Sequence, residues 1–201
     1  MLTMEQARQE LTMAAQMNPG PWERHSLSTA QNAMLIAQKV PGMDSEKAYV
    51  LGLLHDIGRR VGVTGMRHSL DGYTYMMSLG QPDVATVCIT HSYPTREVGH
   101  FEGKHDCTPE EVAFMADFIA KREFDDYDRL IQLCDAVSLP EGACIMEKRF
   151  VDVALRYGAQ DYTIKRWRCY LEEKKYFDAL CGCDIYTLLP NVFENSITNL
   201  I

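Results

Sequence analysis

Apolar residues recur at helical spacing along almost the whole of this 201-residue chain. In a helix, positions three and four residues apart share one face, whereas a half-buried strand shows strict alternation. The alternating patterns and β-branched clusters typical of strands are missing. The spacing predicts an all-α fold of about eight to nine helices, near residues 3–17, 24–39, 44–58, 67–79, 81–91, 108–123, 126–138, 141–157 and 161–180.

Proline and glycine mark the expected breaks between these helices, most clearly at residues 18–21, 62–65 and Pro140. At Thr108-Pro109-Glu110-Glu111, a capping hydroxyl precedes a first-turn proline and two carboxylates that suit the helix dipole. No linker or internal repeat divides the chain. We therefore expect residues 1–201 to form a single domain.

Charge and cysteine content restrict the classes of function. Asp and Glu number 28 against 20 Lys and Arg, and this net charge of −8 argues against broad nucleic-acid binding. The seven cysteines lie mostly in apolar stretches and are expected to be free thiols in a reducing compartment. The start of the chain carries Glu5 and Glu10, whereas a leader peptide would have a basic start followed by an apolar run. No apolar run approaches the roughly 18 residues that a helix needs to span a bilayer. We expect a cytoplasmic protein without a membrane partner.

Two histidines and two aspartates form a candidate metal site. His55 continues the apolar face of the third expected helix and is followed by Asp56, while His25 lies near the start of the second. Asp135 lies in a helix that is apolar around most of its circumference, where a lone carboxylate would cost several kcal/mol. A single histidine on an apolar face is more often a hydrogen-bonded core residue than a ligand. Together the four make a mixed nitrogen and oxygen set suited to Mn, Fe, Ni, Co or Zn, although spacing alone does not establish that they converge.

A longer motif surrounds these residues. The run Gly52-Leu53-Leu54-His55-Asp56-Ile57-Gly58-Arg59, with Arg24-His25-Ser26 before it and Leu133-Cys134-Asp135-Ala136 after it, resembles the HD-domain metal-dependent phosphohydrolase superfamily, in its HDIG branch. The resemblance covers residues 20–140 as a metal-binding core and leaves 141–201 as a C-terminal helical extension. It implies an HD-domain helical bundle. It also implies four metal ligands, at His25, His55, Asp56 and Asp135.

Some members of this superfamily hold two metal ions, using two further histidines between the HD pair and the last aspartate. His68 and His91 stand in that order here. The resemblance implies that they bind a second ion and that Asp56 bridges the pair. We therefore expect one or two divalent ions, drawn from Fe, Mn, Ni, Co and Zn.

A cationic side chain would hold phosphate oxygens beside the metal. Arg59 is the best candidate, because the family commonly has Lys or Arg directly after the HDIG run. Four weaker candidates are more often solvated surface charges: Arg60, Arg67, Arg96 and Lys104. The segment Glu147-Lys148-Arg149 is interpreted as an exposed turn of helix with no chemistry.

The irregular stretch 93–107 is typical of a lid or of a surface insert. Its His100 and His105 are expected at the surface, with contact to substrate as the second interpretation. Tyr73 and Tyr93 are expected to fill the core, and a stacking platform near the ligands is the alternative.

The leading hypothesis, which rests mainly on the resemblance, is a metal-dependent phosphohydrolase. Its substrate would be a phosphomonoester or phosphoanhydride of a nucleotide-like small molecule, attacked by hydroxide on the metal, with Asp56 and Arg59 assisting. Two alternatives keep the same fold: a di-iron oxygenase, which shares the six-ligand pattern, and a non-catalytic ligand-binding module. The resemblance leaves a homodimer open.

Overall fold

The structure is a computed structural model that describes residues 1–197. These residues form ten α-helices, three 3-10 helices and one small hairpin, which confirms the predicted all-α class. The α-helices are α1 (Met4–Met17), α2 (Trp22–Ala37), α3 (Ser45–Leu54), α4 (Arg67–Ser78), α5 (Pro82–Thr90), α6 (Pro109–Ala120), α7 (Asp126–Ala136), α8 (Met146–Tyr157), α9 (Thr163–Cys181) and α10 (Val192–Ile197). The 3-10 helices are η1 (Ile57–Val61), η2 (Val98–His100) and η3 (Ile185–Thr187), and the strands are β1 (Ser138–Leu139) and β2 (Gly142–Ala143).

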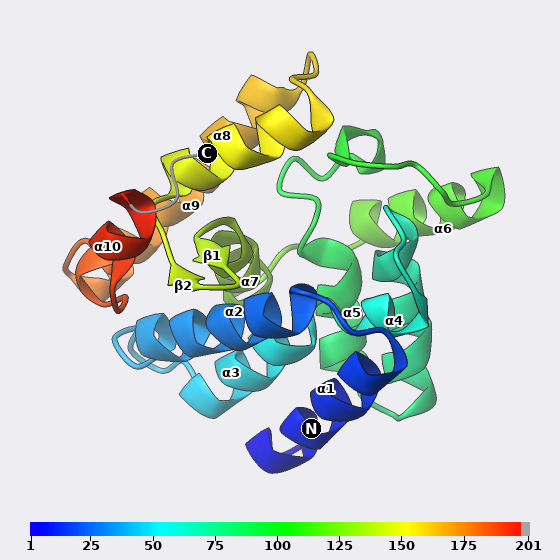
Figure 1. Cartoon of the computed structure of the whole chain (residues 1–201), viewed down its shortest axis with the longest axis horizontal. Coiled ribbons are helices and arrows are strands. Elements are labelled where there is room, and N and C mark those ends of the chain that lie inside the picture. The colour runs from blue at the N-terminus through cyan, green and yellow to red at the C-terminus, as the bar shows by residue number, and fades with distance from the viewer. Residues whose placement is uncertain (198–201) are drawn as a thin grey trace.

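Helix α7 lies at the centre of the bundle, where it contacts α2, α3, α5, α8 and α9. The α2 and α3 helices lie side by side, and α4 packs on α5 (Figure 1). One hydrophobic cluster joins Leu11 of α1, Leu53 of α3, Leu133 of α7 and Phe177 of α9. The helices that follow residue 140 therefore pack onto the same core as the helices before it.

The structure corrects three details of the predicted elements. The antiparallel hairpin pairs Ser138 with Ala143 and Leu139 with Gly142, so the helix expected from residue 141 begins at Met146. Strands of two residues are too short to show alternation, which is why the sequence did not reveal them. The helix expected over 44–58 ends at Leu54, and the six-residue α10 and the 3-10 turn before it were not predicted.

The predicted capping signal before α6 is confirmed. The Glu111 backbone N–H donates to Thr108 Oγ1 at 3.3 Å, and the Thr108 N–H donates to Glu111 Oε2 at 2.8 Å. Pro109 occupies the first turn, where a missing N–H costs no hydrogen bond. The start of this helix is thus encoded locally.

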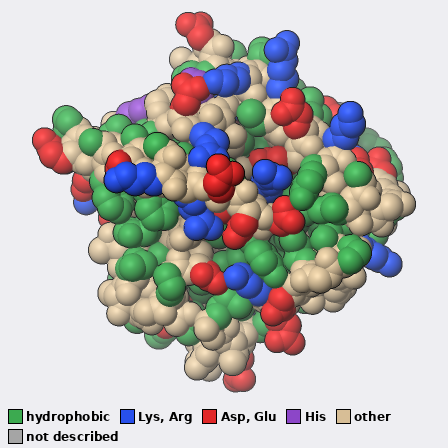
Figure 2. Space-filling view, turned by 180° about the vertical axis from the view of Figure 1, so that it is seen from behind, with side chains coloured by type: hydrophobic (Ala, Val, Ile, Leu, Met, Phe, Trp, Pro, Cys, Tyr) green, Lys and Arg blue, Asp and Glu red, His purple; other side chains and the backbone are tan. Residues whose placement is uncertain are grey.

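All seven cysteines have free thiols, as predicted. Among the described residues, no helix combines the length and the apolarity that crossing a membrane requires. On the face drawn in Figure 2, Lys and Arg side chains alternate with Asp and Glu side chains instead of forming one continuous basic surface.

A glycine fixes the contact between η1 and α4. A Cβ at Gly58 would lie 1.9 Å from the backbone oxygen of His68 and 2.5 Å from the backbone nitrogen of Gly72. We expect Gly58→Ala to lower the free energy of unfolding by about 1–3 kcal/mol, because α4 must move away from η1. Gly99→Ala is the matched control, since nothing lies within 4 Å of its Cβ position. Equal urea midpoints for the two variants would contradict the close approach.

A buried carboxyl group in α9 predicts a pH-dependent stability. Glu173 Oε2 is shielded from solvent without a hydrogen-bond partner, and burial raises the pKa of this carboxyl well above 4.5, although Arg129 and Arg166 oppose the shift. Below pH 4.5 the group is protonated in both the folded and the unfolded chain, so it has no effect on stability. Above that pH the unfolded chain ionises first, and the folded state loses up to about 1.4 kcal/mol per pH unit.

Glu173→Gln should therefore be more stable than wild type at pH 7.5, and this advantage should vanish at about pH 3, well below the ordinary pKa of a glutamate. Chemical unfolding at the two pH values measures this difference. The exposed Glu123 provides the control, because its charge is not among the causes of the Glu173 shift and Glu123→Gln should leave the pH profile unchanged. A Glu173→Gln gain of the same size at both pH values would show that ionisation is not the cause.

Candidate metal centre

His55 and Asp56 lie where α3 gives way to η1. His55 keeps helical backbone angles, whereas Asp56 has φ −102° and ψ 13°, in the sparsely populated bridge region. Both side chains are buried. The end of the α-helix at Leu54 thus places the HD pair in a turn and not within a continuous helix.

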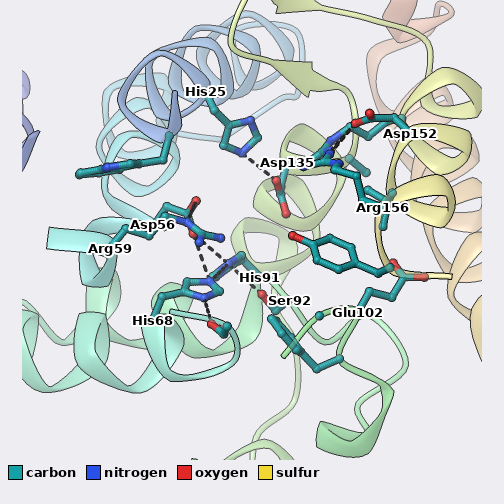
Figure 3. Close-up of a pocket in the computed structure, with 18 of the residues that line it drawn as sticks. His25, Asp56, Arg59, His68, His91, Ser92, Glu102, Asp135, Asp152 and Arg156 are labelled. Carbon is teal, nitrogen blue, oxygen red and sulfur yellow. Dashed lines mark hydrogen bonds and ion pairs between the residues drawn. The ribbon is translucent and has the colours of Figure 1, made fainter. Parts of the chain in front are cut away.

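The other four predicted ligands come from the ends of four different helices. His25 lies in the first turn of α2 and His68 in the first turn of α4. His91 caps the C-terminal end of α5, and Asp135 belongs to the last turn of α7. Figure 3 shows these side chains directed into one pocket. The structure therefore brings together all six residues that the motif nominated.

The six side chains form two groups, which Asp56 connects. In the first, Asp135 Oδ1 lies 2.9 Å from His25 Nε2 and 4.0 Å from His55 Nε2. In the second, Asp56 Oδ1 lies 3.1 Å from His68 Nε2 and 3.7 Å from His91 Nε2. The other Asp56 oxygen, Oδ2, lies 3.9 Å from His55 Nε2. Asp56 thus faces both groups, one with each oxygen.

Backbone carbonyls fix the orientation of three imidazole rings. The Nδ1 atoms of His55, His68 and His91 lie 2.7, 2.6 and 3.0 Å from the carbonyl oxygens of Gly52, Gly65 and Val87 respectively. A carbonyl oxygen only accepts, so each Nδ1 carries the proton and each Nε2 presents a lone pair to the pocket. Metal-binding histidines are typically oriented by this kind of contact.

The pocket contains facing acceptors with no proton between them. His68 Nε2 and His91 Nε2 lie 3.2 Å apart, although both nitrogens carry lone pairs. His55 Nε2 and Asp56 Oδ1 are buried without a hydrogen-bond partner. Such orphaned acceptors are costly unless a cation lies among them. The donor set therefore fits divalent metal ions.

The protonation states also suit metal binding. Burial raises the pKa of Asp56, but the charge of Arg59, with the neighbouring histidines, outweighs it and holds this pKa well below its usual value. The pKa of Asp135 is likewise lowered, because its bond to His25 outweighs burial. Burial and the neighbouring histidines lower the pKa of His91 to about 3. At neutral pH the carboxylates are ionised and His91 is neutral, as ligands must be.

A protein-family model described as HD domain matches residues 22–139, which is more than half of the chain. The chain belongs to the HD domain family. The match contains all six residues of the candidate metal centre and ends at the hairpin. Searches of curated proteins and of solved structures gave no match. Proteins of the HD domain family are generally metal-dependent hydrolases.

Five of the six candidate ligands line a cavity of about 730 Å³, while the sixth, His55, is fully buried. Arg59 lies in the cavity as predicted, and its Nε contacts Asp56 Oδ2 at 2.5 Å. Among the four weaker candidates, Lys104 lines the cavity. The loop before it supplies Phe101 and Glu102 to the same wall. Part of the 93–107 stretch therefore belongs to the site.

The other three weaker candidates are engaged outside the cavity. Arg60 lies over the ring of Tyr75, with 3.8 Å between its Cζ and the ring centroid. Arg67 donates to both oxygens of Glu111 at 2.9 Å. Arg96 lies over the ring of Phe124 and donates to backbone carbonyls. None of the three lines the described cavity, in line with the surface interpretation.

The loop histidines do not line this cavity either. His100 stacks on Tyr162 with 4.6 Å between ring centroids, and its Nδ1 lies 3.0 Å from Thr95 Oγ1. His105 Nε2 lies 3.2 Å from the carbonyl oxygen of Phe101. Both hold the loop together, and neither is placed to touch a bound substrate.

Neither Tyr73 nor Tyr93 forms a stacking platform in the described cavity. Tyr93 is fully buried, and Tyr73 packs against Phe114 and Phe118, away from the cavity. The core interpretation of these two tyrosines is therefore the one that the structure supports.

The interpretation of Glu147-Lys148-Arg149 as an exposed turn is wrong for Arg149, which lines the cavity. Its partners on the same wall are Asp152 and Arg156 of α8 and Arg166 of α9. The sequence did contain a pattern that could have identified this wall, because residues 149, 152, 153 and 156 share one helix face. That face is charged and was indistinguishable from a solvated surface until tertiary packing placed it.

Proposed function

We propose that this HD domain protein is a metal-dependent phosphohydrolase that acts on a phosphate ester or anhydride of a nucleotide-like small molecule. The observation that carries the proposal is the convergence of six histidine and aspartate side chains, five of which line a cavity that also contains arginines. The cavity volume of about 730 Å³ falls within the range of roughly 300–1,000 Å³ typical of small-molecule sites. The proposed place in the HDIG branch rests on Ile57 and Gly58, which continue the motif.

Two ion positions account for the geometry. His25, His55 and Asp135 would hold one ion, and His68 and His91 would hold the other. Asp56 would bridge them, because its two carboxylate oxygens face different groups. Bound divalent ions supply a water of lowered pKa, about 7 in favourable sites, and offset the negative charge of the phosphoryl group.

Arg59 would act beside the ions. Its guanidinium is held by Asp56 at 2.5 Å, and it lines the cavity next to the candidate ligands. From this position it would bind phosphate oxygens and orient the phosphorus toward Asp56. This role makes Arg59 a substrate-binding residue.

The test is phosphate release from a panel of nucleotides and sugar phosphates. Protein loaded separately with Mn, Fe, Ni, Co or Zn should release phosphate from at least one member of the panel, with and without oxygen. His55→Ala should abolish that release, whereas His100→Ala should leave it unchanged, because His100 lies outside the cavity. Turnover that requires oxygen would instead identify a di-iron oxygenase on the same six residues. Tight binding without turnover in every metal form would indicate a non-catalytic module.

A further inference from the structure

One wall of the cavity comes from outside the segment that matches the HD domain family. The match ends at residue 139, and α8 begins at Met146. Arg149, Asp152, Val153 and Arg156 of α8 all line the cavity. Their spacing of three, four and seven residues places them on one face of the helix. The family core thus supplies the metal ligands, and this chain's own extension supplies the facing wall.

The two α8 arginines share a single carboxylate. Arg149 Nη1 lies 3.2 Å from Asp152 Oδ2, and Arg156 Nη2 lies 2.5 Å from the same oxygen. Two positive charges therefore face one negative charge. Asp152 also holds the two guanidinium groups close together, which prepares them to bind one anion between them.

The other arginines that line the cavity already have ion-pair or hydrogen-bond partners of their own. Arg59 pairs with Asp56. Arg166 is buried, and its Nη1 donates to the carbonyl oxygens of Ser92 and His100 while its Nε lies 3.3 Å from Glu102 Oε2. Arg149 pairs with the Asp152 carboxylate that it shares with Arg156, and its Nε, like that of Arg166, is buried without a hydrogen bond. Among the arginines of the cavity wall, positive charge therefore exceeds paired negative charge on α8, where two guanidinium groups share one carboxylate.

The α8 arginines adjoin the metal centre on the Asp135 side. Figure 3 shows Asp152 and Arg156 on the same side of the pocket as Asp135, across the view from Arg59 and His68. An anion bound by α8 would thus be a close neighbour of a phosphoryl group at the metal ligands.

We propose that Arg149 and Arg156 form a second anion subsite and that the substrate is a phosphoanhydride, with one phosphate at the metal ligands and the next at these two arginines. This inference rests on the proposed phosphohydrolase function and narrows its substrate class from esters and anhydrides to anhydrides. A guanidinium fork matches phosphate oxygens, and two such forks select an added dianionic group. A simple monoester would leave the α8 subsite without a ligand.

Binding of two non-hydrolysable probes tests the subsite without relying on turnover. Isothermal titration of manganese-loaded protein would compare methylenediphosphonate, which mimics an anhydride, with methylphosphonate, which mimics a single phosphoryl group. We expect wild type to bind the diphosphonate at least about tenfold more tightly. Arg156→Gln and Arg149→Gln should each remove about tenfold of that affinity and change methylphosphonate binding less than about threefold.

Arg168→Gln is the matched control, because Arg168 is exposed on α9 and does not line the cavity. It should change neither affinity. The side chain of Arg156 is 50% exposed, so Arg156→Gln should fold normally. It can therefore test the subsite if Arg149→Gln folds poorly. Equal affinity of wild type for both probes, or equal weakening of both by Arg156→Gln, would overturn the subsite. Diphosphonate selectivity that depends on Arg156 would support the subsite even if no phosphate were released. The binding result thus tests the subsite, and the phosphate-release assay tests the proposed function.

Discussion

Replacing Asp56 with asparagine should lower the rate of phosphate release by roughly a thousandfold or more, because the chemistry of the bound ions is lost with their shared ligand. Asp56 Oδ1 faces His68 and His91, and Oδ2 faces His55 and Arg59. Asparagine keeps the shape of the side chain but removes the negative charge that would hold both ions. The measurement is kcat on the best substrate of the panel, read beside the metal content of the purified variant.

The control for this prediction is Asp83→Asn. Asp83 is exposed at the start of α5 and pairs with Lys47, and it does not line the cavity. Its kcat and metal content should match wild type within about twofold. An Asp56→Asn enzyme that retained both full activity and full metal content would show that Asp56 is not a ligand shared by the two ions.

Replacing Arg166 with methionine should cost about 3–5 kcal/mol in free energy of unfolding, which is typical of breaking a buried ion pair by removing one partner. Arg166 is 5% exposed and joins α9 to the chain after α5 by donating to the Ser92 and His100 carbonyl oxygens. Its removal would leave these carbonyls and the half-buried Glu102 without a donor. Urea unfolding of metal-free protein measures the loss directly.

Lys165→Met is the matched control for Arg166. Lys165 precedes it in α9, and its ammonium pairs with Glu97 at the exposed surface. Exposed pairs contribute at most about 1 kcal/mol, so this variant should unfold near the wild-type midpoint. If Lys165→Met and Arg166→Met lost similar stability, the contacts of Arg166 with the loop would not be a main support of the fold.

The sequence predicted the helices well, because each depends on local spacing and on end signals such as Thr108 and Pro109. The end of α3 was placed four residues too late, at Gly58 instead of Leu54. A helix and a tight 3-10 turn show the same apolar pattern over so short a stretch. Element boundaries are the least reliable part of such predictions for this reason.

The metal-facing residues were also predictable, although by motif and not by geometry. Spacing placed His55 and Asp56 at a packed helix end, but only the resemblance joined them to His68 and His91. The structure then brought these side chains within 4 Å of a shared carboxylate. Their convergence depends on the packing of separate helices, which periodicity does not describe.

The cavity wall of α8 could not be predicted from the sequence in the same way. Arg149 and Arg156 lie in a charged stripe, and a charged stripe is typical of a solvated helix face. Their role depends on the hairpin formed by β1 and β2, which delays the start of α8 to Met146. Two-residue strands carry too little pattern to signal that turn.

The metal content of the reconstituted protein distinguishes a dinuclear centre from a mononuclear one. Wild type loaded with Mn or Fe and then freed of excess metal should retain about two ions per chain by elemental analysis, because His25, His55 and Asp135 form one group and Asp56, His68 and His91 form the other. His68→Ala and His91→Ala should each retain about one, with the His25, His55 and Asp135 group intact. One ion per chain in wild type, unchanged by loss of His68 or His91, would contradict the dinuclear centre.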